Sequence, residues 1–397
     1  MRIGLLTFIQ TNNYGAMLQG YASTRYLESL GHEVIIINVP LLKPGAARKT
    51  DILGRVNGLF ASANRKLQHS LDKKKKQSYF EKLRMNLDAD LQKQAKEYDK
   101  ANMSFFNEFR QKYLPNITTK EYFYDSDFEQ DFPDADLYIV GSDQVWNPWV
   151  TNDQVGVFFF SFLKNTTKKR ISYAASFGGS KRWIYSKEET EYIHSLIKKF
   201  DGIAIRDGES KYILENIFKT QSIEVLDPTF LIDDYDELTN DCPLDTKGSL
   251  FCFKFIINDY WADVIKFLGK ELKLDIRMDT CLIPFDGLPY KPLCTVNEWL
   301  KLIKTSDFVF TDSFHGMVFC ILFRKQFIVT PSYAHGEGRY KDLAQKLGLE
   351  DRLYMSTDEV YASKDVWTKP IDYDKVYTKL NKLKKDSQSY LLSFIQN

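Results

Sequence analysis

The sequence predicts an α/β protein with two parallel-sheet domains that face each other across a cleft. Short apolar runs alternate with segments of helical periodicity in both halves of the chain, which is typical of strands covered by helices on both faces. An acidic segment containing Pro and Gly separates the two alternating stretches. A chain of 397 residues is long enough for two domains of ordinary size.

The first alternation begins at the N-terminus. The apolar runs "RIGLLTF" and "EVIIINV" flank a segment of helical periodicity and predict a βαβ unit. Residues 43–120 are rich in Lys, Gln, Asn and Asp and predict a helical insertion. The alternation resumes with a helix near 187–200 and the strands "DLYIVGS", "RISYAAS", "GIAIRD" and "IEVLDPTF". We expect residues 1–235 to form the N-terminal domain.

The second alternation follows residues 232–248, which lack periodicity and are the best linker in the chain. We expect residues 246–397 to form the C-terminal domain. Its predicted strands are "SLFCFKFI", "LDIRMD", "DFVFT" and "QFIVTP". Its predicted helices lie near 259–271, 296–305, 314–324 and 338–347.

Composition argues against several classes of protein. The 54 basic and 53 acidic residues nearly cancel, so no overall field attracts nucleic acid. Five cysteines are scattered without a C-x-x-C pair, and no His, Cys, Asp and Glu set has metal-ligand spacing. The sequence therefore predicts reduced thiols, a cytoplasmic protein and no bound metal. The run "DKKKKQ" at 72–77 indicates a solvated helix face or, alternatively, a peripheral contact with the inner membrane surface.

The segment "TDSFHGMVF" at 311–319 predicts an anion site. It joins an apolar strand directly to a helix, which leaves backbone N–H groups and the positive end of the helix dipole at the carboxyl end of the sheet. Asp312 or Ser313 is suited to cap the helix, and Gly316 lets a ligand approach the backbone. His315 either contacts an anion or moves a proton near neutral pH, or it caps the helix within its own domain.

A second polar group follows the first strand, in "TNNYGAMLQG". Asn12, Asn13 and Gly15 form the predicted loop, and Gln19 lies one turn into the helix. Such a loop suits hydroxyl or phosphate recognition. It lacks the glycines of the dinucleotide and Walker A motifs, and ordinary turn chemistry at a helix start is the alternative interpretation.

A third polar group is "VGSDQVWNP", again at a strand end. Ser142, Asp143, Gln144, Trp146 and Asn147 combine hydroxyl, carboxylate, amide and ring, a set that suits carbohydrate. Asp143 could take a proton from a sugar hydroxyl. The alternative is a helix cap beside a buried tryptophan.

Three further positions could contribute to an anion site. Ser176 and Gly178, in "ASFGG", could present hydroxyl and backbone donors. Arg206 ends an apolar strand, where a guanidinium must be paired with an acidic neighbour or with a ligand anion. Arg339, in "AHGEGRY", begins a helix after another strand and could add a second positive charge.

Taken in order, the segments "NNYGAMLQGYA", "YIVGSDQVWN", "SYAASFG", "IAIRDGES", "VLDPTFLI" and "TDSFHGMVF" resemble the polysaccharide pyruvyl transferase family. The resemblance covers nearly all of the chain except 43–120 and the C-terminal tail. It implies two Rossmann-like domains arranged as in GT-B glycosyltransferases. It also implies transfer of a pyruvyl group from phosphoenolpyruvate to a sugar, as a ketal across two hydroxyls in exopolysaccharide or capsule biosynthesis.

The resemblance assigns roles to particular residues. The family's Arg-x-His element falls on "SFH", which gives His315 a donor-site role and leaves Ser313 where many members carry the arginine. Arg206 matches the other family arginine. The donor side is then Arg206, Ser313, Phe314, Gly316, Ser176, Gly178 and Arg339, with His315 and Asp143 as catalytic residues. The acceptor side is Asn13, Tyr14, Gly15, Gln19, Ser142, Gln144, Trp146 and Asn147.

The resemblance implies phosphoenolpyruvate as co-substrate without a further cofactor, and a sugar or lipid-linked oligosaccharide as acceptor. Two alternatives remain at this point. One is a nucleotide-sugar glycosyltransferase of the same fold. The other is a non-catalytic binding protein of a polysaccharide assembly, because Ser313 removes one cation from the donor site.

Overall fold

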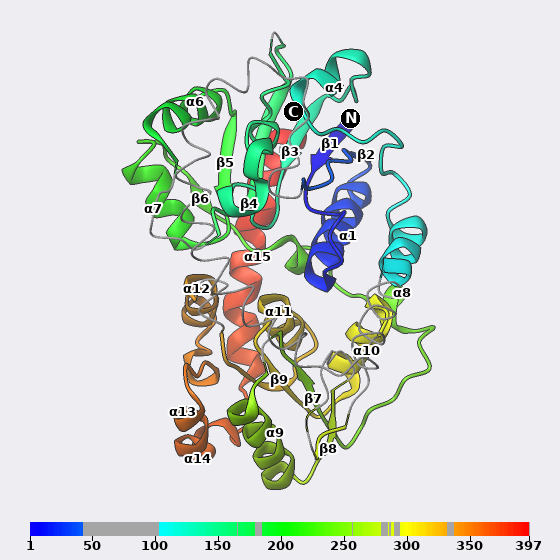
Figure 1. Ribbon diagram of the computed structural model, residues 1–397, viewed down its shortest axis with the longest axis vertical. Coiled ribbons are helices and arrows are strands. Elements are labelled where there is room, and N and C mark those ends of the chain that lie inside the picture. The colour runs from blue at the N-terminus through cyan, green and yellow to red at the C-terminus, as the bar shows by residue number, and fades with distance from the viewer. Residues whose placement is uncertain are drawn as a thin grey trace, which may run out of the picture.

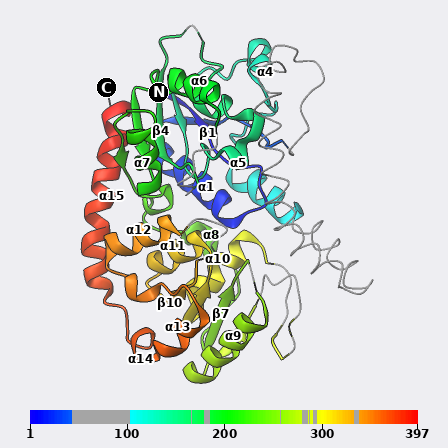
Figure 2. The same ribbon diagram turned by 60° about the vertical axis from the view of Figure 1, so that its left-hand side comes forward.

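The computed structural model describes residues 1–42, 103–164, 166–178, 185–255, 257–278, 285, 287–289, 294–331 and 337–396. It forms two α/β bodies joined along one side by a long C-terminal helix (Figures 1 and 2). The lysine run at 72–77 and most of the predicted insertion at 43–120 lie outside the described residues. No helix within these ranges combines the length and apolar character needed to cross a bilayer.

The N-terminal sheet has six parallel strands in the order β2-β1-β3-β4-β5-β6. Every residue of β3 is buried, as expected for a strand covered on both faces. The strands are β1 (Arg2–Leu6), β2 (Glu33–Ile36), β3 (Leu137–Val140), β4 (Lys169–Ala175), β5 (Gly202–Ile205) and β6 (Ile223–Glu224). The helices are α1 (Tyr14–Ser29), α4 (Asp125–Gln130), α5 (Pro148–Thr151), α6 (Lys187–Ile197) and α7 (Gly208–Asn216), with 3-10 turns at Asn152–Gln154, Val157–Phe159 and Pro228–Phe230.

The C-terminal sheet has four parallel strands in the order β10-β9-β7-β8. Its strands are β7 (Ser249–Phe253), β8 (Asp275–Arg277), β9 (Phe308–Thr311) and β10 (Gln326–Val329). Its helices are α9 (Asp259–Leu272), α10 (Val296–Thr305), α11 (Phe314–Leu322), α12 (Gly338–Leu347), α13 (Thr357–Ala362) and α14 (Lys364–Trp367), with a 3-10 turn at Glu350–Arg352. Two parallel-sheet α/β domains confirm the predicted fold class.

The described end of the predicted insertion is helical at 103–113. Phe106, Phe109 and Tyr113 are buried in the core of the N-terminal body. Arg110 is also buried, and its Nη1 donates to the carbonyl of Ile9 at 3.1 Å. This part of the segment therefore belongs to the packed domain.

The segment between the two sheets is held in place by polar contacts. It contains the short helix α8 (Asp236–Thr239). Glu237 in α8 accepts from Tyr21 Oη at 2.6 Å and from Arg25 Nη2 at 2.7 Å, both on α1. The predicted linker is thus a connection that is fixed to the first domain.

Helix α15 (Tyr373–Ile395) begins beside the C-terminal sheet and ends beside the N-terminal sheet (Figure 2). Near its start, the Tyr373 hydroxyl donates to the carbonyl of Cys320 at 3.1 Å. Near its end, Ser387 Oγ accepts from the Leu226 N–H at 2.9 Å, and Tyr390 Oη donates to the Ser172 carbonyl at 3.0 Å. The predicted division into 1–235 and 246–397 does not include this return of the chain to the first sheet.

Candidate active site

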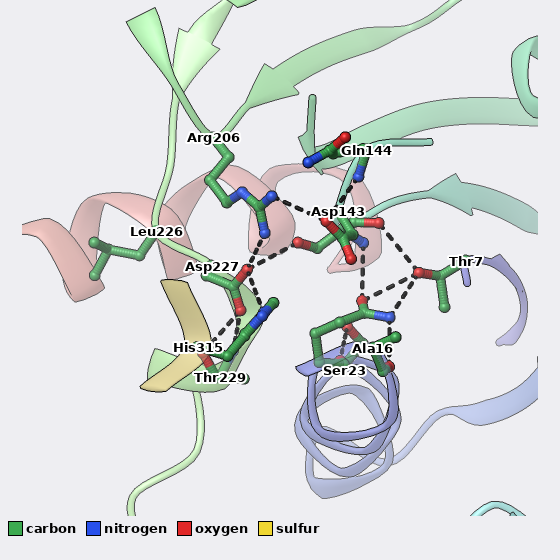
Figure 3. A network of polar contacts seen from close by, with 12 residues as sticks. Thr7, Ala16, Ser23, Asp143, Gln144, Arg206, Leu226, Asp227, Thr229 and His315 are labelled. Carbon is green, nitrogen blue, oxygen red and sulfur yellow. Dashed lines mark hydrogen bonds and ion pairs between the residues drawn. The ribbon is translucent and has the colours of Figure 1, made fainter. Parts of the chain in front are cut away.

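A buried carboxylate lies at the centre of the candidate site (Figure 3). Asp227 follows β6, and its Oδ2 accepts from Arg206 Nη1 at 2.7 Å and from Ser142 Oγ at 3.1 Å. The same oxygen lies 3.5 Å from His315 Nε2. Asp227 Oδ1 accepts from the backbone N–H and the hydroxyl of Thr229 at 3.1 and 2.8 Å. One side chain therefore connects residues of both domains.

These contacts determine the charge of Asp227. Burial raises its pKa, but His315 and Arg206 outweigh that effect and hold the pKa well below its usual range. Asp227 is therefore ionised at neutral pH.

Arg206 is held between two carboxylates. Its Nη2 donates to Asp143 Oδ1 at 3.1 Å while Nη1 donates to Asp227, and the arginine side chain is 2% exposed. Burial lowers the pKa of Arg206, but the two carboxylates raise it more strongly. Burial raises the pKa of Asp143, and Arg206 leads the positive charges that lower it below its usual range. Arg206 and Asp143 are therefore both charged at neutral pH.

The corner between β9 and α11 has the geometry expected of an anion site. Ser313 is the N-cap of α11, and its Oγ accepts from the Gly316 N–H at 3.1 Å. A Cβ on Gly316 would lie 2.6 Å from Thr311 Oγ1, so a side chain there would disturb the corner. Within the described ranges, the N–H groups of Phe314 and His315 have no hydrogen-bond acceptor. Helix N-termini with free N–H groups attract anions.

Two guanidinium groups lie over the ring of Phe314. The Cζ atoms of Arg206 and Arg339 are 4.9 and 5.2 Å from the ring centroid. Within the described part of the chain, the buried atoms Arg206 Nε and Arg339 Nε have no hydrogen-bond partner, whereas His315 Nε2 lies 3.5 Å from Asp227 Oδ2. Buried donors without acceptors are costly, and an anionic ligand beside Phe314 would supply acceptors.

The N-terminus of α1 closes against this corner from the other domain. A Cβ on Gly15 would lie 2.0 Å from His315 Nδ1, so the imidazole packs directly on the glycine backbone. Tyr14 stacks on Trp299 of α10 with ring centroids 5.1 Å apart, and its hydroxyl donates to the Cys294 carbonyl at 2.7 Å. Tyr14 and Gly15, predicted to bind the acceptor, thus form a contact between the domains.

Three predicted acceptor residues are structural, which corrects the prediction. Trp146 is 0% exposed and donates from Nε1 to the Phe158 carbonyl at 3.0 Å, so its ring cannot stack on a sugar. Gln19 is also 0% exposed, and its amide bonds Thr7 and the Ala16 carbonyl. Ser142 is equally buried and donates its hydroxyl to Asp227. These polar atoms are already used within the protein.

Other predicted positions make local contacts at the ends of their own strands or at the start of α1. Gln144 is partly exposed, and its Oε1 accepts from Asn147 Nδ2 at 2.6 Å. Ser176 is buried, and its Oγ accepts from the Gly178 N–H at 3.0 Å. Asn13 is exposed and caps α1 by accepting from the Ala16 N–H.

Sequence similarity identifies the family of this chain. Residues 13–332 match the family description "Polysaccharide pyruvyl transferase". The chain belongs to the polysaccharide pyruvyl transferase family. This family is a class of transferases, and its name implies a sugar acceptor. No curated protein matches the chain.

Solved structures with a similar fold include nucleotide-sugar enzymes. One is a UDP-GlcNAc 2-epimerase from Neisseria meningitidis bound to UDP-GlcNAc, at 10% identity and TM-score 0.50, covering 100% of each chain. Others are the spinosyn rhamnosyltransferase SpnG, at 10% identity and TM-score 0.47, covering 98% of this chain and 96% of that one, and S. aureus MnaA with UDP, at 12% identity and TM-score 0.47, covering 100% and 98%. At 10% identity, the similarity to the epimerase shows the fold alone.

Asp227 is the main residue that sequence reasoning did not select in this pyruvyl transferase family member. The motif "VLDPTF" contributed to the family resemblance, but its aspartate was assigned no role. An acidic residue at the end of an apolar strand, followed by proline, was the available signal. Its partners Arg206 and His315 lie 21 and 88 positions away in the chain, so spacing alone could not reveal the contacts.

Proposed function

We propose that this protein transfers a pyruvyl group from phosphoenolpyruvate to two hydroxyls of a sugar. The observation that carries the proposal is the pair of buried guanidinium donors over Phe314, Arg206 Nε and Arg339 Nε, at the N-terminus of α11. They lie beside two ionised carboxylates in a member of a pyruvyl transferase family. This combination supplies both an anion site and acid–base groups.

The donor would bind with its phosphate toward the first turn of α11. Phosphoenolpyruvate carries a phosphate and a carboxylate, and both need positive groups in a buried site. The N–H groups of Phe314 and His315 and the guanidinium of Arg339 are suited to these anions. Arg206 is already paired with Asp143 and Asp227, so it contributes its unpaired Nε–H rather than a free charge.

The reaction would begin with proton transfer from His315 to the methylene carbon of phosphoenolpyruvate. This step converts the methylene to a methyl group and makes the neighbouring carbon electrophilic. The first sugar hydroxyl bonds that carbon and gives up its proton. The bond from that carbon to the phosphate oxygen then breaks, and the second hydroxyl closes the ketal. Of the two hydroxyl protons, one replaces the proton lost by His315 and the other leaves with phosphate.

The two carboxylates would have different roles. Asp227 lies 3.5 Å from His315 Nε2, close enough to orient the imidazole that transfers the first proton. Asp143 is 17% exposed and lies where it could accept a proton from a sugar hydroxyl. Its lowered pKa makes it a weak base, which suffices because a hydroxyl becomes strongly acidic as it bonds an electrophilic carbon.

The acceptor would enter from the side of the partly exposed Gln144 and the exposed Asn13. Both carry amides, which suit sugar hydroxyls. The acceptor class we propose is a free, nucleotide-linked or lipid-linked sugar.

The test is incubation of the purified protein with phosphoenolpyruvate and a panel of nucleotide-linked and lipid-linked sugars. The proposal expects a mass gain of one pyruvyl group on an acceptor together with release of inorganic phosphate. A protein that transfers sugar from a nucleotide-sugar and ignores phosphoenolpyruvate would be a glycosyltransferase instead. One that binds acceptor sugars without converting them with either donor would be a non-catalytic binding protein.

A further inference from the structure

A lysine is buried directly beneath the corner that begins α11. Lys254 follows β7, and its side chain is 1% exposed. Its Nζ donates to Thr330 Oγ1 at 2.6 Å and lies 3.7 Å from Asp312 Oδ2. The ammonium also lies 4.4 and 4.7 Å from the ring centroids of Trp261 and Phe310. A lysine is rarely buried so completely unless it is paired.

The partner carboxylate belongs to the residue before the N-cap of α11. Asp312 is 2% exposed, and its Oδ1 accepts from the Phe255 N–H at 2.8 Å. Its carbonyl accepts from Tyr340 Oη at 2.8 Å, beside Arg339. The pair formed by Lys254 and Asp312 therefore connects the ends of β7 and β9 at the predicted donor site.

The charge of Asp312 matters because of where it lies. An uncompensated carboxylate one residue before Ser313 would oppose the positive end of α11 and repel a donor anion in a poorly hydrated environment. Lys254 cancels that charge at short range. Burial lowers the pKa of Lys254 below its usual range, and Asp312 opposes part of that effect, so the ammonium depends on this partner.

We infer that Lys254 is a positioning residue that neutralises Asp312, so that the N-terminus of α11 can accept an anionic donor although Ser313 supplies no charge. Lys254 itself does not contact the donor, since its ammonium is enclosed by Thr330, Asp312 and two rings. The choice of phosphoenolpyruvate as that donor rests on the proposed function. The neutralisation of Asp312 by Lys254 favours the binding of any anion at this helix terminus.

The test is a double-mutant cycle on Lys254→Met and Asp312→Asn, read as affinity for phosphoenolpyruvate and for pyrophosphate by calorimetry. Lys254→Met should weaken phosphoenolpyruvate binding about tenfold, the size expected for one nearby unscreened charge. Asp312→Asn should bind as tightly as the wild type or more tightly. The double variant should return to within about twofold of the wild type, because the charge to be cancelled is gone.

Lys325→Met is the matched control. Lys325 is a partly buried lysine of the same domain that donates to the Lys304 carbonyl at 3.2 Å, at the opposite end of β10. Its loss should lower stability without changing anion affinity. Melting temperatures of all variants separate unfolding from weakened binding.

The inference is overturned if Lys254→Met binds both anions as tightly as the wild type. It is also overturned if the double variant binds as weakly as Lys254→Met, which would make Lys254 a direct ligand of the donor. If Lys254→Met does not fold, weaker binding by Asp312→Asn alone is enough to contradict it. Wild-type protein that binds these anions but transfers no pyruvyl group would contradict the proposed function and leave the inference standing.

Discussion

At the scale of single residues, Gly15 determines whether His315 can occupy its place between the domains. The imidazole lies where a Cβ of residue 15 would be. No other residue type leaves that space free. The sequence indicated a glycine in a loop. It could not show that a histidine 300 positions away packs on that glycine, because this contact forms only where the two domains meet.

The first prediction is that Gly15→Ala displaces His315. A shift of about 1 Å in a catalytic group lowers a rate by about a hundredfold, whereas overpacking costs about 1–3 kcal/mol of stability. The measurements are turnover of phosphoenolpyruvate and urea unfolding. Gly20→Ala, in the same helix, is the control because its Cβ would crowd Ile9 Cγ2 at 2.9 Å and meet Thr7 Cγ2 at 3.9 Å, which overpacks the helix without touching His315. Equal losses of turnover in both variants would contradict the role of Gly15.

The second prediction concerns Asp227→Asn. The variant leaves Arg206 and His315 with one carboxylate fewer, and breaking a buried ion pair costs roughly 3–5 kcal/mol. The higher unfolding free energy of the wild type, compared with Asp227→Asn, requires an ionised Asp227. Since the folded pKa is lowered, that advantage is complete above the unfolded pKa of about 3.9 and is lost as the pH falls below it, because the unfolded chain takes up the proton first.

Urea unfolding of wild type and Asp227→Asn between about pH 7 and pH 3 measures this dependence. The difference in unfolding free energy should be largest near neutral pH and should shrink below about pH 4. A difference that stays constant over the whole range would show that the Asp227 carboxylate is not held by the charges of Arg206 and His315.

At the scale of elements, the sequence predicted where the strands end but not which distant helices pack against them. Continuous apolar runs indicated buried parallel strands. Asn13 and Ser313 each precede a predicted helix, and they cap α1 and α11, as expected for short polar residues at that position. The sequence could not show that α15 returns to the N-terminal sheet. An amphipathic helix shows that one face will be buried, but not which sheet will cover it.

The third prediction is that Ser387→Ala disturbs the site from a distance. Ser387 Oγ accepts from the N–H of Leu226, the residue before Asp227, and an unpaired buried N–H costs about 1–3 kcal/mol. Stability and donor affinity should both fall. Ser389→Ala, on the exposed face of α15, is the control and should change neither. Donor affinity equal to wild type in Ser387→Ala would show that α15 does not position Asp227.

At the scale of the whole molecule, the site exists only where the two domains meet. Asp143, Arg206 and Asp227 follow strands of the first sheet, and His315 follows a strand of the second. The sequence placed nearly all of these residues at strand ends, where ligands bind in open α/β sheets. It overestimated the acceptor side, because buried and ligand-binding polar residues look alike in a sequence, as Gln19 and Trp146 show.

The most direct test of the central claim is phosphate release from phosphoenolpyruvate with a competent sugar acceptor, compared between wild type and His315→Ala. The claim predicts phosphate release in step with the pyruvyl mass gain for wild type, and a loss of at least about a hundredfold for His315→Ala. His194→Ala, on α6 of the N-terminal domain, should keep near-normal turnover. Near-normal phosphate release by His315→Ala would contradict the account.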